Sequence, residues 1–210
     1  MTRVVVFGAG GRTGRLIVEE SLRAGHAVTA AVRTPETFAP AVGEGSLKVI
    51  RADVRDAGSL RAAVQGQDAV VCAVGPSGRH AHGLYSGAAR ALVGAMGAAG
   101  VSRLIALSSA GVRRDDPAFA LWYRLLARTL LRELYDDMRR MEDIVRESPL
   151  DWTFVRPTRL LDAPPGGRSR VQDGLTPPGG WQVTRADVAR FIVQELEGHR
   201  WSRAAPTLAR

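Results

Sequence analysis

A glycine-rich segment near the N-terminus has residue types and a spacing that suit the binding of an anion. Residues 8–14 read GAGGRTG and directly follow a short apolar run, VVVF at 4–7. Gly8 permits a tight turn, Gly11 has no side chain to block a pyrophosphate, and Gly14 permits close packing of a helix on the strand. Free backbone amides and the positive end of a helix favour phosphate. The segment predicts a pyrophosphate-binding turn, and the alternative is a glycine turn that serves packing alone.

The residues at the end of the second expected strand indicate whether a bound dinucleotide is NAD or NADP. Residues 30–34 read AAVRT and contain no acid, whereas an NAD-binding protein usually places Asp or Glu there to bond the ribose hydroxyls. Arg33 could instead meet a 2′-phosphate through charge-assisted hydrogen bonds, and Arg12 in the glycine segment is a second candidate. We therefore expect NADP(H) as the cofactor. The alternative is that both are ordinary surface arginines.

Polar residues also follow the third and fourth expected strands. Asp53 and Val54 would lie near an adenine, where Asp53 could accept from the amino group or simply cap a turn. His80 and His82 lie in the loop after the fourth strand. They could contact a substrate or donate a proton, or they could occupy an exposed loop. A metal would need a third ligand and none is near, so we expect no metal site.

Other catalytic motifs are missing. GPSG at 75–78 has the wrong spacing for a GxSxG nucleophile elbow. Lys48, the only lysine, lies in an expected strand without the glycines of a phosphate-binding Walker loop. Cys72 is the only cysteine, which excludes an internal disulfide and a CxxC redox pair. We expect Cys72 to be an inert buried residue.

Strands and helices are expected to alternate along most of the chain. Apolar β-branched runs predict strands at 4–7, 27–32, 47–50, 69–74, 101–107 and 151–155. Helical spacing and stop signals predict helices at 14–24, 59–64, 83–99, about 116–147 and about 184–197. Asp116 before Pro117 is typical of a helix start, and Thr184 with Asp187 resembles a capping box. Residues 162–180 are rich in Pro and Gly and predict a loop.

This alternation predicts an α/β fold with a doubly wound parallel sheet of the Rossmann type. Right-handed crossovers give the strand order 3-2-1-4-5-6. We expect a single domain over 1–210, with a dinucleotide-binding core at 1–156. Residues 157–210 would form a small substrate-side appendage and the final helix.

Composition fits a globular protein, and we expect its partner to be a small-molecule substrate. The chain of 210 residues is 45% hydrophobic and 24% charged, with a formal net charge of +8. The arginines that carry this charge are scattered, so we expect no nucleic-acid partner. The longest apolar run, at 69–74, is too short for a bilayer, and no signal peptide is evident. We expect a cytoplasmic monomer or homodimer.

Several motifs together resemble those of the atypical short-chain dehydrogenase/reductases. They are the GxxGxxG segment, VR at 32–33, DV at 53–54, LSSA at 107–110, LDWTFVRP at 150–157 and TRADVA at 184–189. The similarity is to the NAD(P)H-binding branch that includes NmrA-like proteins and flavin reductases of the biliverdin-IXβ reductase type. It covers nearly the whole chain, and LDWTFVRP is its most specific motif.

The resemblance implies a role for each matching position. The pyrophosphate and its ribose side would be held by Gly8, Gly11, Arg12, Thr13 and Gly14. The 2′-phosphate would be held by Arg33, the adenine by Asp53 and Val54, and the nicotinamide ribose by Ala73, Val74 and Gly75. The nicotinamide pocket would be bordered by Ser108, Ser109, Arg156, Pro157 and Thr158, with the two serines as the candidate catalytic residues.

The chain departs from the family pattern in catalysis. Many short-chain dehydrogenases use a Tyr-x-x-x-Lys acid pair, but an alignment anchored on LDWTFVRP puts Leu134 and Met138 at those positions. A shift by one residue would bring in Tyr135 and Arg139, and the alternative is a solvated or packed helix face. Without an acid pair, the site favours acceptors that delocalise charge, such as a flavin or a quinone.

Two segments are candidates for a cover over the nicotinamide. Residues 119–131 are apolar on several sides and could form a lid, a dimer face or core, and residues 164–181 end in Trp181, a possible pocket wall. Two functions follow from the whole sequence. The first is an NADPH-dependent reductase, and the alternative is a non-enzymatic NADP(H)-binding regulator of the NmrA-like kind.

Overall fold

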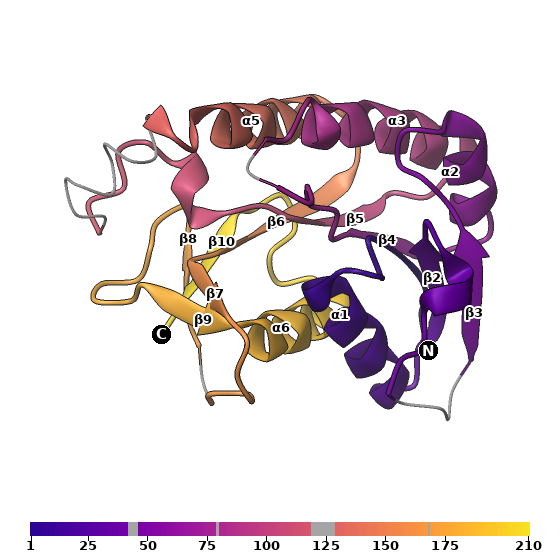
Figure 1. Cartoon of the computed structure of the whole chain (residues 1–210), viewed down its shortest axis with the longest axis horizontal. Helices are drawn as coiled ribbons and strands as arrows, with labels where there is room; N and C mark the ends of the chain where they lie inside the picture. Colours follow the sequence, from indigo (N-terminus) through magenta and orange to yellow (C-terminus); the bar gives the residue numbers. More distant parts are fainter. Residues whose placement is uncertain (42–45, 79, 119–128, 168) are drawn as a thin grey trace.

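The architecture is a twisted sheet between two layers of helices (Figure 1). The computed structural model describes residues 1–41, 46–78, 80–118, 129–167 and 169–210. The strands are β1 (Arg3–Phe7), β2 (Ala27–Val32), β3 (Leu47–Arg51), β4 (Ala69–Cys72), β5 (Arg103–Leu107), β6 (Asp151–Pro157), β7 (Arg159–Leu161), β8 (Arg170–Asp173), β9 (Gln182–Thr184) and β10 (Pro206–Ala209). The helices are α1 (Arg12–Arg23), α2 (Ala57–Val64), α3 (Leu84–Ala99), α5 (Arg132–Arg146) and α6 (Arg185–Gly198), with short 3-10 turns η1 (Pro35–Thr37) and η2 (Ala110–Val112).

The main sheet confirms the predicted Rossmann-type order. Its eight strands run β3-β2-β1-β4-β5-β6-β10-β8, and β1 to β6 are all parallel to their neighbours. The order reverses between β1 and β4, which is where doubly wound sheets bind dinucleotides beyond the carboxyl ends of their strands.

Alternation along the strands divides the core into two halves. Val5 and Phe7 of β1 belong to the cluster that also holds residues of α2, α3 and α5. Val4 and Val6 belong to the cluster that holds Ile17 of α1 and residues of α6. Figure 1 shows the same division, with α2, α3 and α5 on one face of the sheet and α1 and α6 on the other. Strands buried on both faces read as continuous apolar runs, which is why β1 was recognisable in the sequence.

The part of the chain after β6 differs from the prediction. The loop expected over 162–180 is wrong for Arg170–Asp173, which form β8, and β10 was not predicted at all. β10 pairs parallel to β6, and β8 pairs antiparallel to β10 at the sheet edge. β7 and β9 form a separate two-stranded parallel sheet. A core boundary at 156/157 stays a prediction.

The helix expected over about 116–147 is not continuous. Pro117 and Ala118 form a turn, in which Asp116 accepts a hydrogen bond from the Ala118 amide at 3.0 Å. A second turn at residues 130 and 131 precedes α5. The remaining part of this expected helix and most of the first expected cover, residues 119–128, lie outside the described residues. Thr184 is confirmed as the N-cap of α6, because its Oγ1 accepts from the Asp187 amide at 3.1 Å, and the Asp187 carboxylate accepts from the Thr184 hydroxyl at 2.7 Å.

Candidate functional site

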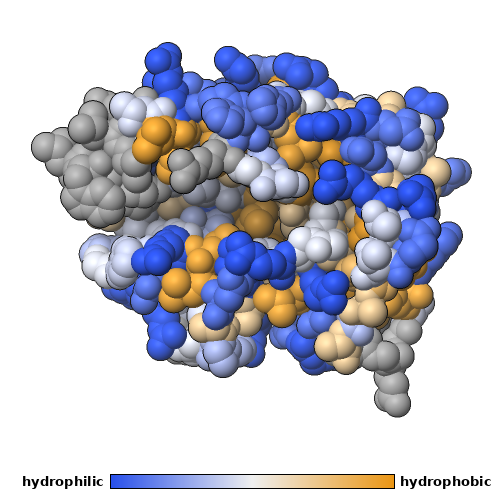
Figure 2. Space-filling model, viewed as in Figure 1, coloured by the Kyte–Doolittle hydropathy of each residue, from blue (hydrophilic) through white to orange (hydrophobic). Residues whose placement is uncertain are grey.

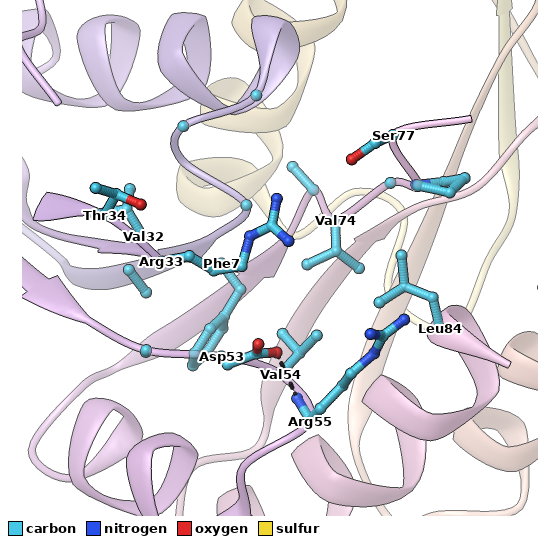
Figure 3. A pocket seen from close by; sticks show the side chains of 18 of the residues that line it. Phe7, Val32, Arg33, Thr34, Asp53, Val54, Arg55, Val74, Ser77 and Leu84 are labelled. Carbon is cyan, nitrogen blue, oxygen red and sulfur yellow. Dashed lines mark hydrogen bonds between the residues drawn. The ribbon is translucent and has the colours of Figure 1, made fainter. Parts of the chain in front are cut away.

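A cavity of about 760 Å³ lies beyond the carboxyl ends of β1 to β4 (Figure 3). It is lined by the glycine turn, by residues 31–34 and 52–55 at the ends of β2 and β3, and by residues 73–78 after β4. His80, Ala81, His82 and Leu84 complete the wall on the side of α3. Figure 2 shows that the face seen there is hollowed between the two helical layers.

The glycine turn is built as the sequence predicts. Gly8 has φ +78°, and a Cβ on it would lie 2.6 Å from the Ala73 carbonyl oxygen. A Cβ on Gly14 would lie 2.1 Å from the Gly8 carbonyl oxygen, so neither position admits a side chain. The Gly11 amide donates to the Gly8 carbonyl oxygen at 2.9 Å and closes the turn.

The start of α1 suits a phosphate ligand. Its N-cap residue, Gly11, supplies no side-chain cap, and the first helical turn contains no acidic residue. The amides at a helix start have no partner within the helix, and the helix dipole favours an anion there. The residues present therefore fit a cofactor diphosphate at this turn. Thr13 and Gly14 are buried in the first turn of α1 and support it.

The cavity is lined by arginines from three parts of the chain, Arg15, Arg33 and Arg55. The Arg33 side chain extends from the end of β2 into the space between the glycine turn and Val74 (Figure 3), and it makes no ion pair with any residue that the structure describes. Arg15 also lines the cavity, with its Nη1 donating to the Ala39 carbonyl oxygen at 2.7 Å. Sequence reasoning missed Arg15, although it lies one helical turn beyond Arg12.

Arg12 points elsewhere. Its guanidinium pairs with Asp162 at 2.5 Å, and Asp162 also pairs with Arg185 at the start of α6 at 2.8 Å. This bridge joins the start of α1 to the chain after β7, and Arg12 is absent from the cavity wall. Of the two arginines suggested for a 2′-phosphate, the structure places Arg33 in the cavity and Arg12 in an ion pair.

The predicted adenine and ribose residues lie together in the cavity wall. They are Asp53, Val54, Ala73, Val74 and Gly75. Asp53 Oδ1 accepts from the Arg55 amide at 2.9 Å, so one carboxylate oxygen already stabilises the turn after β3. Asp53 therefore caps a turn, which is one of the two roles that the sequence predicts for it, and it also lines the cavity.

Ser108 and Arg156 meet in a buried polar cluster beneath the ends of β5 and β6. Ser108 Oγ donates to Glu142 Oε1 at 2.7 Å, and Arg156 Nε donates to the same oxygen at 2.9 Å. Glu142, on α5, is 1% exposed and also pairs with Arg146 at 2.7 Å. Buried charges are found paired in this way because an isolated one is costly. The hydroxyl proton of Ser108 is thus committed to Glu142.

The other residues predicted near the nicotinamide lie close by in the chain but outside the cavity wall. Ser109 caps η2, where its Oγ accepts from the Gly111 amide at 3.2 Å, and it is partly exposed. Pro157 is buried at the end of β6, and Thr158 Oγ1 donates to the Leu208 carbonyl oxygen at 3.0 Å. Their roles toward a nicotinamide stay predictions.

The shifted tyrosine and arginine both lie on α5, and the described contacts of Arg139 are with other groups. Arg139 donates to the Val112 carbonyl oxygen at 2.8 Å and pairs with Asp136. The Tyr135 ring packs over Gly111, where a Cβ would lie 2.4 Å from the ring. A role for Tyr135 and Arg139 as an acid pair stays a prediction.

Two further buried groups lie under the cavity. Burial raises the pKa of the Cys72 thiol to about 11, which keeps it protonated and fits the expected inert residue. Burial also raises the pKa of Tyr85, with smaller contributions from Cys72 and Asp137. A Cβ on Gly75 would lie 3.7 Å from the Tyr85 hydroxyl, so this phenol lies near the cavity floor.

The described part of the chain contains neither a cluster of metal ligands nor a membrane-spanning helix. No group of three or more His, Cys, Asp or Glu is placed to hold a metal ion there. None of the described helices is long and apolar enough to cross a membrane.

Trp181, which the sequence suggested as a pocket wall, is not among the residues that line the cavity. It is 57% exposed and stacks on Arg159, with 5.3 Å between the guanidinium carbon and the ring centroid.

Comparison with known proteins finds a nucleotide-binding family and structures of similar fold. Residues 8–199 match the protein family described as NAD(P)H-binding. An uncharacterized chloroplastic protein of Arabidopsis thaliana is 33% identical over 210 residues, which cover 92% of this chain and 71% of that protein.

Two solved structures share the fold. A short-chain dehydrogenase/reductase from Veillonella parvula in complex with NADP is 20% identical with a TM-score of 0.85, covering 100% of this chain and 94% of that one. A Streptococcus pneumoniae protein described as a candidate NADH-flavin reductase is 23% identical with a TM-score of 0.78 and full coverage of both chains. The expected cytoplasmic location and oligomeric state stay predictions.

Proposed function

Since the chain belongs to the NAD(P)H-binding family, we propose that it is an NADPH-dependent reductase that transfers hydride to a conjugated acceptor such as a flavin or a quinone. The observation that carries the choice of cofactor is the position of Arg33. Its side chain enters the cavity at the end of β2, where residues 30–34 offer no acid. A guanidinium there suits a 2′-phosphate and has no counterpart in an NAD-selective site.

The chain's own residues would bind and orient the cofactor. The amides at the start of α1 would hold the diphosphate, and Arg33 would hold the 2′-phosphate with Arg15 nearby. When bound, NADPH supplies a hydride. Ser109, a partly exposed residue just beyond β5, would orient the nicotinamide or the acceptor by a hydrogen bond. We expect Ser109→Ala to lower turnover modestly.

The kind of acceptor follows from what α5 lacks. The alignment anchored on LDWTFVRP puts Leu134 and Met138 at the positions of the tyrosine and the lysine, and Met138 is buried in the core. A simple ketone needs a proton on its oxygen as hydride arrives, because a bare alkoxide is costly in a dry site. A flavin or quinone spreads the charge and takes its proton from water. The candidate flavin reductase among the structural neighbours is consistent with such an acceptor.

The proposal is tested by titrating the protein with NADPH and NADH and then following NADPH oxidation with a panel of flavins, quinones and aldehydes. We expect tighter NADPH binding and turnover restricted to the conjugated acceptors. Equal affinity for the two cofactors would refute the cofactor assignment. Turnover of simple aldehydes at rates equal to those of quinones would refute the acceptor class.

The missing acid pair also favours a second function. A protein that binds NADP(H) without turning over a substrate, as a regulator, needs no proton donor, and Leu134 with Met138 provides none. Tight NADPH binding with no oxidation by any acceptor in the panel would support this regulator in place of the reductase.

A further inference from the structure

The turn at residues 80–83 has an unusual backbone for its sequence. His82 has φ +48° and Gly83 has φ +70°, so two consecutive residues adopt the left-handed conformation. Glycine adopts it freely, but a residue with a Cβ does so at a cost in free energy. A histidine is held in this conformation only where surrounding contacts compensate.

Glu133 of α5 supplies those contacts from a distant part of the chain. Its Oε2 accepts from the Ala81 amide at 2.9 Å, and its Oε1 accepts from the His82 amide at 2.8 Å. The same carboxylate lies 3.5 Å from Nδ1 of His80. The two amide hydrogen bonds lower the pKa of Glu133, so the carboxylate is charged at neutral pH.

A second carboxylate one helical turn further along α5 anchors the chain that follows. Asp137 accepts from the Tyr85 amide at 2.9 Å and from the Ser86 amide at 3.4 Å. These amides belong to the first turn of α3, whose N-cap residue, Gly83, has no side chain to bond them. Residues four apart on a helix share a face, so Glu133 and Asp137 hold consecutive parts of the chain from one side.

The held turn is also a wall of the cavity. His80, Ala81 and His82 all line it, although Glu133 itself does not. The carboxylate therefore lies on the side of the turn that faces α5, and the cavity lies on another side. Any change in the backbone of the turn would move three wall residues together.

We propose that Glu133 is a positioning residue for cofactor binding, because its carboxylate fixes the left-handed turn at 80–83 that completes the cavity wall. This inference rests on the proposed function for the identity of the ligand, NADPH. Glu133 would touch neither cofactor nor substrate and would act only through the turn.

The test compares Glu133→Gln with Glu147→Gln. Gln has nearly the same shape, but it offers one carbonyl oxygen and turns an NH₂ donor toward the second amide. Glu147, the exposed C-cap residue of α5, gives a control with the same loss of charge. Three quantities are measured for each variant: NADPH affinity, the melting temperature and the hydrogen exchange of the Ala81 and His82 amides.

We expect Glu133→Gln to weaken NADPH binding by about 5- to 20-fold, the loss of roughly one charge-assisted bond in a partly exposed site. The two amides should exchange faster than in the wild type, while the melting temperature stays close to that of Glu147→Gln. If Glu133→Gln does not fold, Glu133→Asp, which keeps the charge on a shorter arm, takes its place in the same comparison.

A double-mutant cycle separates positioning from a purely structural role. His82→Gly removes the strain of the left-handed turn, so the penalty of Glu133→Gln should shrink in the His82→Gly background. The same penalty in both backgrounds, or unchanged NADPH affinity in Glu133→Gln, would overturn the inference. Failure of the wild type to bind NADPH would instead refute the proposed function, and amide exchange would still report whether Glu133 holds the turn.

Discussion

Substitution of Arg33 by Ala should remove most of the preference for NADPH over NADH. The guanidinium reaches the cavity and is not paired with a described acid, so the native side chain is available to a 2′-phosphate. A hydrogen bond to a charged group is worth about 1.5–3 kcal/mol, which corresponds to roughly 10- to 150-fold in affinity. Arg33 is exposed, and solvent weakens exposed charge pairs. We therefore expect a loss of about 10- to 50-fold for NADPH and little change for NADH.

The assay is a direct binding titration of both cofactors to the wild type, Arg33→Ala and Arg55→Ala. Arg55 lines the same cavity beside Asp53 and Val54, so its removal takes away the same charge at the end of β3. If long-range attraction alone favoured NADPH, both variants would lose affinity to the same extent, and added salt would remove the difference between them and the wild type. The reasoning fails if Arg33→Ala binds both cofactors more weakly by the same factor, or if Arg55→Ala loses as much selectivity.

Three other predictions follow from the structure. Gly14→Ala should cost about 3 kcal/mol or more of unfolding free energy in thermal denaturation, because its Cβ would lie 2.1 Å from a backbone oxygen, whereas Gly94→Ala, with open space in α3, should be neutral or stabilising. The pKa of Asp68 is lowered from 3.8 to about 2, chiefly by its hydrogen bond from the Arg3 side chain. The charged Asp68 therefore stabilises the fold above pH 4, and this contribution should disappear as the pH falls toward 2. Asp68→Asn should flatten the pH dependence of the denaturant midpoint over that range. Tyr135→Phe should change turnover by only a small factor, and a loss of more than about 100-fold would restore this tyrosine as a general acid.

The parts of the fold that the sequence predicted are those with local signals. Buried parallel strands read as uninterrupted apolar runs, so β2 was placed at its observed bounds and β1 within one residue. The glycine turn was predicted from glycine spacing directly after an apolar run, and the close approach of Gly14 to the Gly8 carbonyl oxygen explains why that spacing is needed. The placement of cofactor-binding residues at the ends of the strands followed from the predicted strand order alone.

The parts that were missed depend on contacts between distant residues. β8 and β10 have four residues each, with charged or proline positions. They are strands because β10 pairs with β6 and β8 pairs with β10. The sequence around Glu133 shows an ordinary amphipathic helix, and nothing local indicates that its carboxylate bonds amides about fifty residues earlier. The sequence analysis named Arg12 and not Arg15, and only the distant Asp162, which pairs with Arg12, shows that Arg12 lies outside the cavity wall while Arg15 lines it.

The position of β10 between β6 and β8 has a consequence for the order of folding during synthesis. β8, at 170–173, has β10 as its neighbour in the sheet, and β10 comes more than thirty residues later. When β8 has just been synthesised, its partner β10 is still missing. The edge of β6 that β10 will later cover is then also unpaired. Unpaired strand edges are sites of misassembly. The charged residues at both ends of β8, Arg170 and Asp173, would keep this segment solvated until its partner emerges from the ribosome.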